Sequence, residues 1–531
     1  MSKVIEMRYA LAAIMLTGSI GTAGANDFPE TRNSLSLEPI GTYATGVFDG
    51  SAAEIAAFDP TTKRVFVVNA EANAVDVLDI RNPRRLTLLF SIEMAPYGAV
   101  TNSVDVDRNV VAIAVENEVK TDPGRAVFFN VNGRYLSDVT VGALPDMLTF
   151  TPNGRKLLVA NEGEPDDTYT VDPEGSVSIV DLRGNVRALS QRQVTTANFR
   201  RFNRADIDPD IRIFGPGASV AQDLEPEYIA ISQDSRAAWV SLQESNALAL
   251  LDIEAGRIDK LIALGFKDHS QARNALDASN EDGGINIESW PIRGMYQPDA
   301  IAAYSTRGES YIVTANEGDA RDYDGFSEET TVGELVLDPA VFPDAAELQL
   351  PENLGVLTTT TATGDANNNG VFEEIYAFGA RSFSIRDARG KLIYDSGVEF
   401  ERITARLLPD EFNSDNTEND SFDDRSDAKG PEPEGVDIGR AFGRQYAFIG
   451  LERVGGIMVY DISDPRDVRF VDYVNNRDFD GDAEAGTAGD LGPEGVLFIS
   501  SGDSPINVPL LIVANEVSGT TTVFRINREQ D

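Results

Sequence analysis

The sequence LLVANE at residues 157–162 decides the fold, because close copies recur as YIVTANE at residues 311–317 and LIVANE at residues 511–516. Each copy is a short apolar run of the kind that forms a buried β-strand. Each is preceded by Pro and an acidic residue, as at Pro145-Asp146. A second apolar run follows the first copy, VSIVDL at residues 177–182. The chain is therefore organised by a repeated unit of several short strands.

Working outward from these copies, further units begin at Glu227 and Glu434, two looser units begin near Glu54 and Ser103, and a degenerate unit covers residues 375–395. Units of about four strands that recur seven or eight times predict an all-β fold, a β-propeller with repeats of the YVTN/WD40 kind. We expect one domain over residues 34–530. We also expect the strand-like residues 37–43 to pair into the last blade and close the ring. Uneven spacing predicts long loops at 264–297, 320–372 and 405–432. Two stacked β-sandwiches are the weaker alternative.

The composition limits the ligands and the reactive side chains that this protein can use. The chain of 531 residues has 45 Lys and Arg against 87 Asp and Glu, a formal charge of −42, which disfavours nucleic acid and anionic lipid and favours cations. The chain lacks cysteine, which removes thiolate chemistry and disulfides. Its one histidine, His269, lies in a polar stretch and is interpreted as a surface residue. Carboxylates, hydroxyls, Lys, Arg and hard cations remain.

The N-terminus resembles an export signal. Lys3 and Arg8 precede the apolar run YALAAIML at residues 9–16, and Ala23-Gly24-Ala25 matches a signal-peptidase site. Residues 1–25 are therefore predicted to be a signal peptide, and the mature protein to be periplasmic or secreted. The run is too short to span a bilayer, and we expect no transmembrane segment in the mature chain.

The repeated acids suggest a functional site, since inner strands of a propeller line its axis. The acid after each Pro and the Glu that ends each neighbouring strand should gather at one mouth of the ring. Glu54 and Glu434 belong to the first set, and Glu71, Glu118, Glu244 and Glu452 to the second. The predicted funnel rim comprises Asp146, Glu162, Glu227, Asp299, Glu317, Asp319, Arg321, Glu494 and Glu516. The alternative is architectural: these Glu side chains accept backbone N–H groups of the next blade.

Basic residues are scarce, so those near the predicted rim are candidates for binding an oxyanion. The candidate catalytic residues are Arg381, Asp427, Lys429, Glu434, Glu452 and Arg453. With a carboxylate-bound cation, such groups could hold a phosphoester while water or the hydroxyl of Ser426 attacks. Simple neutralisation of the acidic rim is the other interpretation.

Two loops have the character of calcium sites. Residues 364–374 place oxygen ligands as in the first half of an EF-hand loop, and Gly370 supplies the sharp turn. The predicted ligands are Asp365, Asn367, Asn369, Glu373 and Glu374. A plain Asn/Gly hairpin is the alternative. Asp478, Asp480 and Asp482 form a weaker candidate. Ca²⁺ is therefore the expected cofactor.

Five longer motifs carry a resemblance to a known family: ARSFSI at 380–385, DRSDAKGPEPE at 424–434, GLER at 450–453, GDLGPEG at 489–495 and NEVSGT at 515–520. With these motifs the chain, over residues 34–530, resembles the choice-of-anchor I family. That family includes mesenchyme-specific cell-surface glycoproteins linked to biomineralisation and bacterial members labelled atypical alkaline phosphatases. The resemblance implies an exported, propeller-like domain. The family name refers to C-terminal surface anchors, and we expect none in this chain.

The leading hypothesis is an exported, acidic, calcium-binding propeller that acts as a periplasmic or surface-associated binding protein. A calcium-dependent phosphatase or phosphodiesterase that acts in the funnel is the second hypothesis. The third is a structural protein without a small ligand, which predicts no convergence of basic residues at the mouth of the ring.

Overall fold

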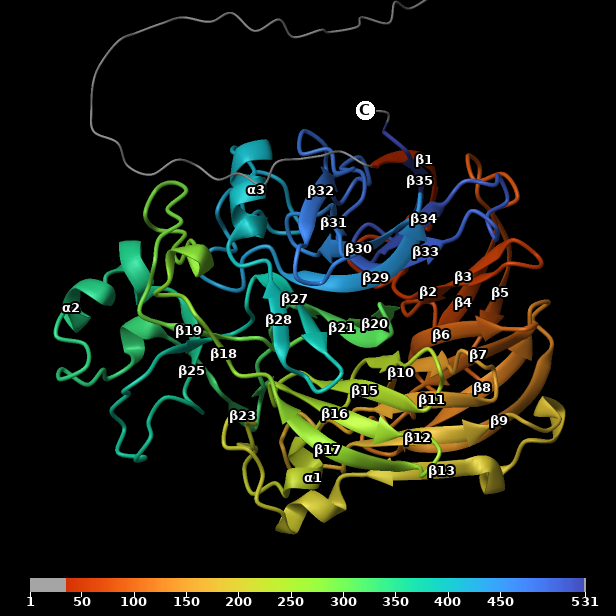
Figure 1. Ribbon diagram of the computed structural model, residues 1–531, viewed down its shortest axis with the longest axis horizontal. Coiled ribbons are helices and arrows are strands. Elements are labelled where there is room, and N and C mark those ends of the chain that lie inside the picture. Colours follow the sequence, from red (N-terminus) through yellow and green to blue (C-terminus); the bar gives the residue numbers. More distant parts are fainter. Residues whose placement is uncertain (1–34, 530–531) are drawn as a thin grey trace, which may run out of the picture.

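The computed structural model describes residues 35–529, and seven four-stranded sheets surround one axis there (Figure 1). Neighbouring inner strands contact each other in the cyclic order β2, β6, β10, β14, β20, β29, β33 and back to β2. The fold is therefore a closed β-propeller, as the repeats predict, and it has seven blades where the repeats allow seven or eight. The predicted signal peptide lies outside the described residues.

Each blade has the same antiparallel strand order from the axis outward. The inner strands are β2 (Ala56–Asp59), β6 (Thr101–Asp107), β10 (Pro145–Phe150), β14 (Ile229–Ile231), β20 (Ile301–Thr306), β29 (Pro433–Ala441) and β33 (Pro493–Ile499). The second strands are β3 (Arg64–Asn69), β7 (Val110–Val115), β11 (Lys156–Asn161), β15 (Ala237–Leu242), β21 (Glu309–Asn316), β30 (Arg444–Leu451) and β34 (Leu510–Asn515). The third strands are β4 (Ala74–Asp79), β8 (Pro123–Asn130), β12 (Ser176–Asp181), β16 (Ala247–Asp252), β27 (Ser382–Asp387), β31 (Ile457–Asp461) and β35 (Thr520–Asn527). The outer strands are β5 (Thr87–Glu93), β9 (Tyr135–Ala143), β13 (Val194–Asn198), β17 (Arg257–Ala263), β28 (Leu392–Asp395), β32 (Arg469–Val474) and β1 (Ser36–Ala44).

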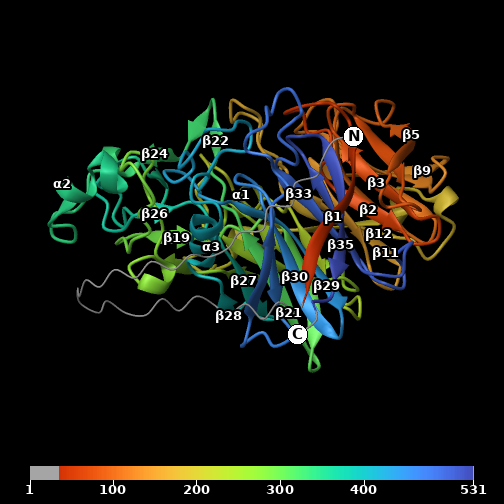
Figure 2. The same cartoon turned by 90° about the horizontal axis from the view of Figure 1, so that it is seen from above.

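The ring is closed by the N-terminal strand. β1 pairs antiparallel with β35 and forms the outer strand of the blade that holds β33, β34 and β35 (Figure 2). The expected closure is confirmed, and the last blade is built from both ends of the described chain.

The degenerate unit at residues 375–395 is not an eighth blade. Its first part, β26 (Tyr376–Ala377), belongs to a separate sheet, whereas β27 and β28 complete the blade begun by β20 and β21. The chain leaves that blade after Asn316 and returns at Ser382. A long excursion within one blade therefore resembled an additional repeat in the sequence.

This excursion and the segment after β17 form an insertion beside the ring (Figures 1 and 2). Its five-stranded sheet has the order β18, β19, β26, β25, β24, and a two-stranded hairpin lies next to it. Its further elements are β18 (Phe266–Asp268), β19 (Arg293–Met295), β22 (Asp322–Tyr323), β23 (Phe326–Ser327), β24 (Glu329–Thr331), β25 (Thr358–Thr360) and α2 (Ala345–Leu348). Two other helices are α1 (Val220–Asp223) before β14 and α3 (Glu399–Leu407) after β28. The loops expected at 264–297 and 320–372 thus contain a small folded layer.

The core lies between the blades. One buried cluster joins Leu158 and Val177 of one blade to Ala238 and Val240 of the next. Because neighbouring blades cover both faces of each sheet, the second strands are apolar at nearly every position, which explains runs such as LLVA.

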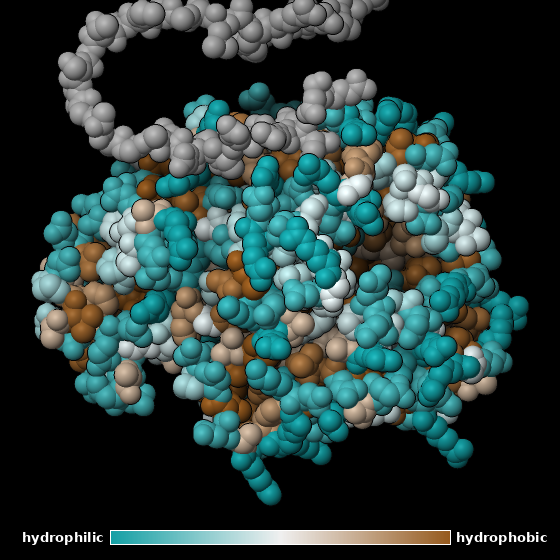
Figure 3. All heavy atoms as spheres, in the orientation of Figure 1, coloured by the Kyte–Doolittle hydropathy of each residue, from teal (hydrophilic) through white to brown (hydrophobic). Residues whose placement is uncertain are grey.

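The face seen in Figure 3 is largely hydrophilic, in keeping with the formal charge of −42. Among residues 35–529, no helix combines the length and the apolar character needed to cross a bilayer.

The prediction for His269 is wrong, since its side chain is only 2% exposed. Its Nδ1 donates to the carbonyl of Asn274 at 2.6 Å, and the neighbouring Lys267 is also buried, donating to the carbonyls of Ala380 and Gly397. The polar stretch is therefore buried as part of the insertion, and its Lys267 and His269 side chains are held by hydrogen bonds to backbone carbonyls.

We predict that His269 stays neutral far into the acid range. Burial, and then the charge of Lys267, lower the pKa of His269 from 6.5 to about 3. The unfolded chain takes up this proton below about pH 6.5, so the contribution of His269 to stability falls as pH drops from 6.5 towards 3. The chain has one imidazole, so its NMR resonances can be followed directly as pH is lowered. A midpoint near 6.5 in the folded protein would contradict the prediction.

Candidate functional site

Two tiers of carboxylates lie at one end of the propeller axis. In the blade of β10, Pro145 pairs with Asn161, so Asp146 at the start of β10 and Glu162 just after β11 lie at the same end of the sheet. The same register recurs in the blades of β29 and β33. Repetition of one strand register therefore gathers acids from distant parts of the sequence.

The inner tier comes from the start of each inner strand. Its carboxylates are Glu54, Asp146, Glu227, Asp299, Glu434 and Glu494, and Asn102 takes the corresponding place in the blade of β6. The outer tier comes from the ends of the second strands, and its members are Glu116, Glu162, Glu244, Glu317, Glu452 and Glu516. A small cavity of about 70 Å³ lies among Asn102, Asp146, Asp299 and Glu494, and Tyr228 also lines it. We call this mouth of the ring the axial funnel.

Carboxylates of the two tiers form three compact groups, and within each group the oxygens lie within 4.8 Å of one another. The groups are Glu54–Glu494–Glu516, Glu162–Glu227–Glu244 and Asp299–Glu317–Glu434. Three carboxylates this close repel one another strongly unless a cation or protons intervene.

Every one of these groups contains a buried oxygen without a hydrogen-bond partner among the described residues. These oxygens are Glu494 Oε2 in the first group, Glu227 Oε2 and Glu244 Oε2 in the second, and Glu434 Oε2 in the third. Buried carboxylate oxygens are normally hydrogen-bonded or bound to a metal. The unpartnered oxygens therefore mark places that can accept a cation.

The pKa values of these carboxylates are raised, because burial and mutual repulsion both disfavour the charged form. Burial, followed by neighbouring negative charges, raises the pKa of Glu54 to about 8 and that of Asp146 to about 7. For Glu227, Glu434 and Glu494 the same two causes raise the pKa well above its ordinary value. The funnel therefore favours the binding of cations or protons, which neutralise its carboxylates.

A fourth group, Glu317–Glu432–Glu452, shares Glu317 with the third group and already contains a cation from the chain. Lys429 Nζ lies 2.8 Å from Glu317 Oε1 and 3.1 Å from Glu432 Oε2. Arg453 Nε is 3.1 Å from the same Glu432 oxygen, and Arg425 Nη2 is 2.7 Å from the other. Burial would raise the pKa of Glu432, but Lys429, Arg453 and Arg425 together lower it to about 2. The fourth group shows how the funnel satisfies its acids where a basic side chain is present.

The remaining basic candidate, Arg381, does not pair with the carboxylates of the funnel. Arg381 pairs with Glu401 of α3 at 2.6 Å and donates to the carbonyls of Asp277, Ser426 and Ala428. The structure thus brings Lys429, Arg453, Glu434 and Glu452 towards the funnel, while Arg381 fastens a loop to α3.

Arg321 and Asp319 lie in the segment that follows β21. Arg321 is buried and pairs with Asp223 and with Glu225, whose Oε2 is 2.9 Å from Nη2. Asp319 is exposed, and its carbonyl accepts from Gln297 Nε2. Both residues therefore belong to the insertion that borders the funnel.

Ser426 is fully buried, donates to Asp423 Oδ1 at 2.6 Å and accepts from Asn413. The neighbouring Asp427 uses its carbonyl to accept the N–H of Thr358. These contacts place the hydroxyl of Ser426 in the packing of the loop.

The two predicted calcium loops lie on the surface, away from the four carboxylate groups. Asp365 accepts backbone N–H groups of Asn369 and Gly370, while Glu374 pairs with Arg293 at 2.9 Å. Asp478 and Asp482 likewise accept backbone N–H groups within their own loop. In both loops the carboxylates cap turns.

Sequence reasoning missed Asn102, Glu116 and Glu432. The register pairs Thr101 with Val115, which puts Asn102 and Glu116 at the funnel, where Asn102 donates to Glu116 at 2.9 Å. Glu118, chosen by its similarity to the Asn-Glu pairs, is exposed, as is Glu71. Counting from the end of each second strand would have identified Glu116, which follows β7 as Glu162 follows β11.

The hydrogen bonds between blades that the architectural alternative assigns to the repeated Glu residues are made by other carboxylates. Asp105 Oδ2 accepts the N–H of Phe150 in the next blade at 2.8 Å, and Asp437 Oδ2 accepts that of Phe498 at 2.7 Å. These bonds tie blades together near the other end of the inner strands.

The fold and the site define a β-propeller with an acidic axial funnel. The chain belongs to the choice-of-anchor I domain family, whose model matches residues 54–465.

Two curated proteins are similar to parts of the chain. Gigasin-3a of Magallana gigas is 29% identical over 188 residues, which cover 33% of this chain and 64% of that protein. A mesenchyme-specific cell surface glycoprotein of Strongylocentrotus purpuratus is 27% identical over 294 residues, 48% of this chain and 36% of that protein. The chain thus spans less than two thirds of either relative.

Solved structures with a similar overall fold include Kuenenia stuttgartiensis hydrazine synthase, with a TM-score of 0.45, 12% identity and coverage of 91% of this chain and 99% of that chain. Streptogramin B lyase has a TM-score of 0.44 and 9% identity, and covers 93% of this chain and 98% of that chain.

Proposed function

We propose that this protein is a secreted, periplasmic or surface-associated propeller that binds Ca²⁺ ions in its axial funnel. Membership of the choice-of-anchor I family and similarity to a protein named as a cell surface glycoprotein support a place outside the cytoplasm. The observation that carries the cation proposal is the set of unpartnered, buried carboxylate oxygens, at least one in each of three groups.

The choice of Ca²⁺ follows from the ligands. Ca²⁺ takes six to eight oxygen ligands in flexible geometry, whereas Mg²⁺ demands a compact octahedron. Three carboxylates offer up to six oxygens without imposing an octahedron, which fits the irregular shell of Ca²⁺. Asp365, Asn367 and Asn369 stay the proposed ligands of a separate and weaker surface ion.

Calcium titration tests the proposal. We expect purified protein, freed of metal by chelator, to take up about three Ca²⁺ ions in the funnel, one per group. Glu434→Gln removes a charge from one group and should lower the count by one. Glu118→Gln, at an exposed position in the same class of motif, should leave it unchanged. Wild-type protein that binds no Ca²⁺ would overturn the proposal.

The hydrolase hypothesis makes a separate prediction, turnover of p-nitrophenyl phosphate that depends on Ca²⁺ and disappears with chelator. Since Arg381 and Lys429 already bind carbonyls and carboxylates, we expect Ca²⁺ binding without this turnover. Chelator-sensitive hydrolysis that Lys429→Ala abolishes would favour the enzyme.

A further inference from the structure

The three open carboxylate groups differ in their access to solvent. Glu227 and Glu244 are 6% and 4% exposed, and each has an unpartnered oxygen. In Glu54–Glu494–Glu516 all three members are only partly buried. The Glu162–Glu227–Glu244 group therefore combines the deepest burial with the largest unmet demand for a cation.

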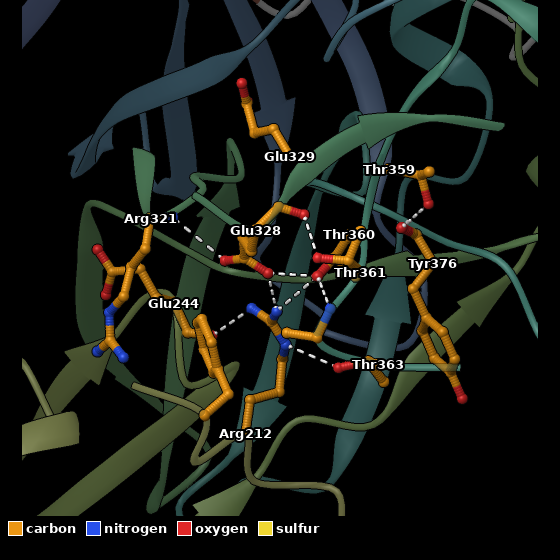
Figure 4. Close-up of polar contacts among 12 residues, drawn as sticks. Arg212, Glu244, Arg321, Glu328, Glu329, Thr359, Thr360, Thr361, Thr363 and Tyr376 are labelled. Atoms are coloured by element: carbon orange, nitrogen blue, oxygen red, sulfur yellow. Dashed lines mark hydrogen bonds and ion pairs between the residues drawn. The ribbon is translucent and has the colours of Figure 1, made fainter. Parts of the chain in front are cut away.

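A buried ionic network between Arg212 and the insertion holds the backbone of Glu244, one member of this group (Figure 4). Arg212 Nη1 donates to the carbonyl of Glu244 at 2.7 Å, and its Nη2 pairs with Glu328. Glu328, fully buried, also accepts the N–H of Arg321 at 3.1 Å and the hydroxyl of Thr360. The guanidinium of Arg212 thus holds the backbone of Glu244 and is itself held by Glu328 and Thr360 of the insertion.

The β22–β23 hairpin packs on residues 164–169, the segment that follows Glu162; we call residues 322–327 the hairpin roof. Tyr323 donates to Glu164 at 3.0 Å, and the N–H of Gly325 donates to the carbonyl of Asp167 at 2.8 Å. Phe326 packs its ring 5.7 Å from that of Tyr169.

We propose that Glu162, Glu227 and Glu244 hold a resident divalent cation of the Ca²⁺ class beneath the hairpin roof. This ion exchanges slowly, whereas an ion at Glu54–Glu494–Glu516 exchanges freely with the funnel. The inference rests on the proposed function, because it assigns different roles to two of the cation sites.

The physical reason is that a buried ion leaves only when its cover opens. Opening the hairpin roof breaks the Tyr323–Glu164 and Gly325–Asp167 hydrogen bonds and separates the aromatic contact of Phe326. Local opening of this kind limits the rate of exchange.

Release kinetics test the inference. Protein loaded with Ca²⁺ is mixed with excess fluorescent chelator, and the release phases and their amplitudes are measured. We expect one ion per chain to leave in a phase at least about tenfold slower than the others. Glu227→Gln should remove the slow phase, and Glu494→Gln should remove a fast one. Tyr323→Ala should accelerate the slow phase without changing the number of ions, while Tyr323→Phe, which keeps the ring, changes it less.

The outcomes separate the two proposals. Wild-type protein that binds Ca²⁺ but releases all of it in one fast phase overturns the resident site alone. A slow phase that persists in both Glu227→Gln and Glu244→Gln assigns the retained ion elsewhere and also overturns it. Protein that binds no Ca²⁺ overturns both proposals. If Glu227→Gln does not fold, the wild-type phases and Tyr323→Ala decide.

Discussion

Removal of calcium is expected to lower the melting temperature of this protein by a large margin. A ligand that binds only the folded state stabilises it by about 2.7 kcal/mol when its concentration is a hundredfold above its dissociation constant. Three occupied groups would together contribute about 8 kcal/mol, a large fraction of the stability of a typical domain. Differential scanning calorimetry in Ca²⁺ and in chelator measures the difference.

A matched variant distinguishes funnel ions from those bound at surface loops. The triple variant Glu227→Gln, Glu434→Gln and Glu494→Gln removes one charge from each group. Because its repulsion is smaller, it should melt above the wild type in chelator and respond little to Ca²⁺. An equal response of wild type and variant would assign the stabilisation to other ions, such as those proposed at Asp365.

The propeller could be predicted from the sequence because its signal is repeated. Strands buried on both faces leave apolar runs such as LLVA and LIVA, and the residues that end them recur in register. The blade count was left open at seven or eight, because a folded insertion divides one blade between β21 and β27. A sequence repeat does not show which strands share hydrogen bonds.

The acidic funnel was predicted in outline for the same reason, but its internal pairing was not. Lys429 was chosen because basic residues are scarce, yet its partners Glu317 and Glu432 are 112 and three residues away in sequence. Glu432 lies in the motif DRSDAKGPEPE, two residues before Glu434, and the repeated Pro-acid pattern favours Glu434. Which of two nearby acids meets the cation depends on the loop conformation, and composition carries no signal of that.

Lys429→Met is expected to destabilise the protein by about 3–5 kcal/mol, the usual cost of removing one partner from a buried ionic cluster. Lys429 Nζ contacts Glu317, Glu432 and the carbonyl of Gly318, so its loss leaves Glu317 without its ammonium partner. Arg425 and Arg453 still face Glu432, so the fold should survive. The midpoint of thermal unfolding in chelator measures the loss.

Calcium should restore part of that stability, because a divalent ion can take the place of the ammonium among Glu317, Glu432 and Glu452. The variant should then respond more steeply to Ca²⁺ than the wild type and bind one more ion. Lys391→Met is the control, because Lys391 is exposed and directly precedes β28, and it should change the midpoint little. If Lys429→Met behaves like this control in chelator, the ammonium does not neutralise the cluster, and the contrast between the fourth group and the three open ones loses its physical basis.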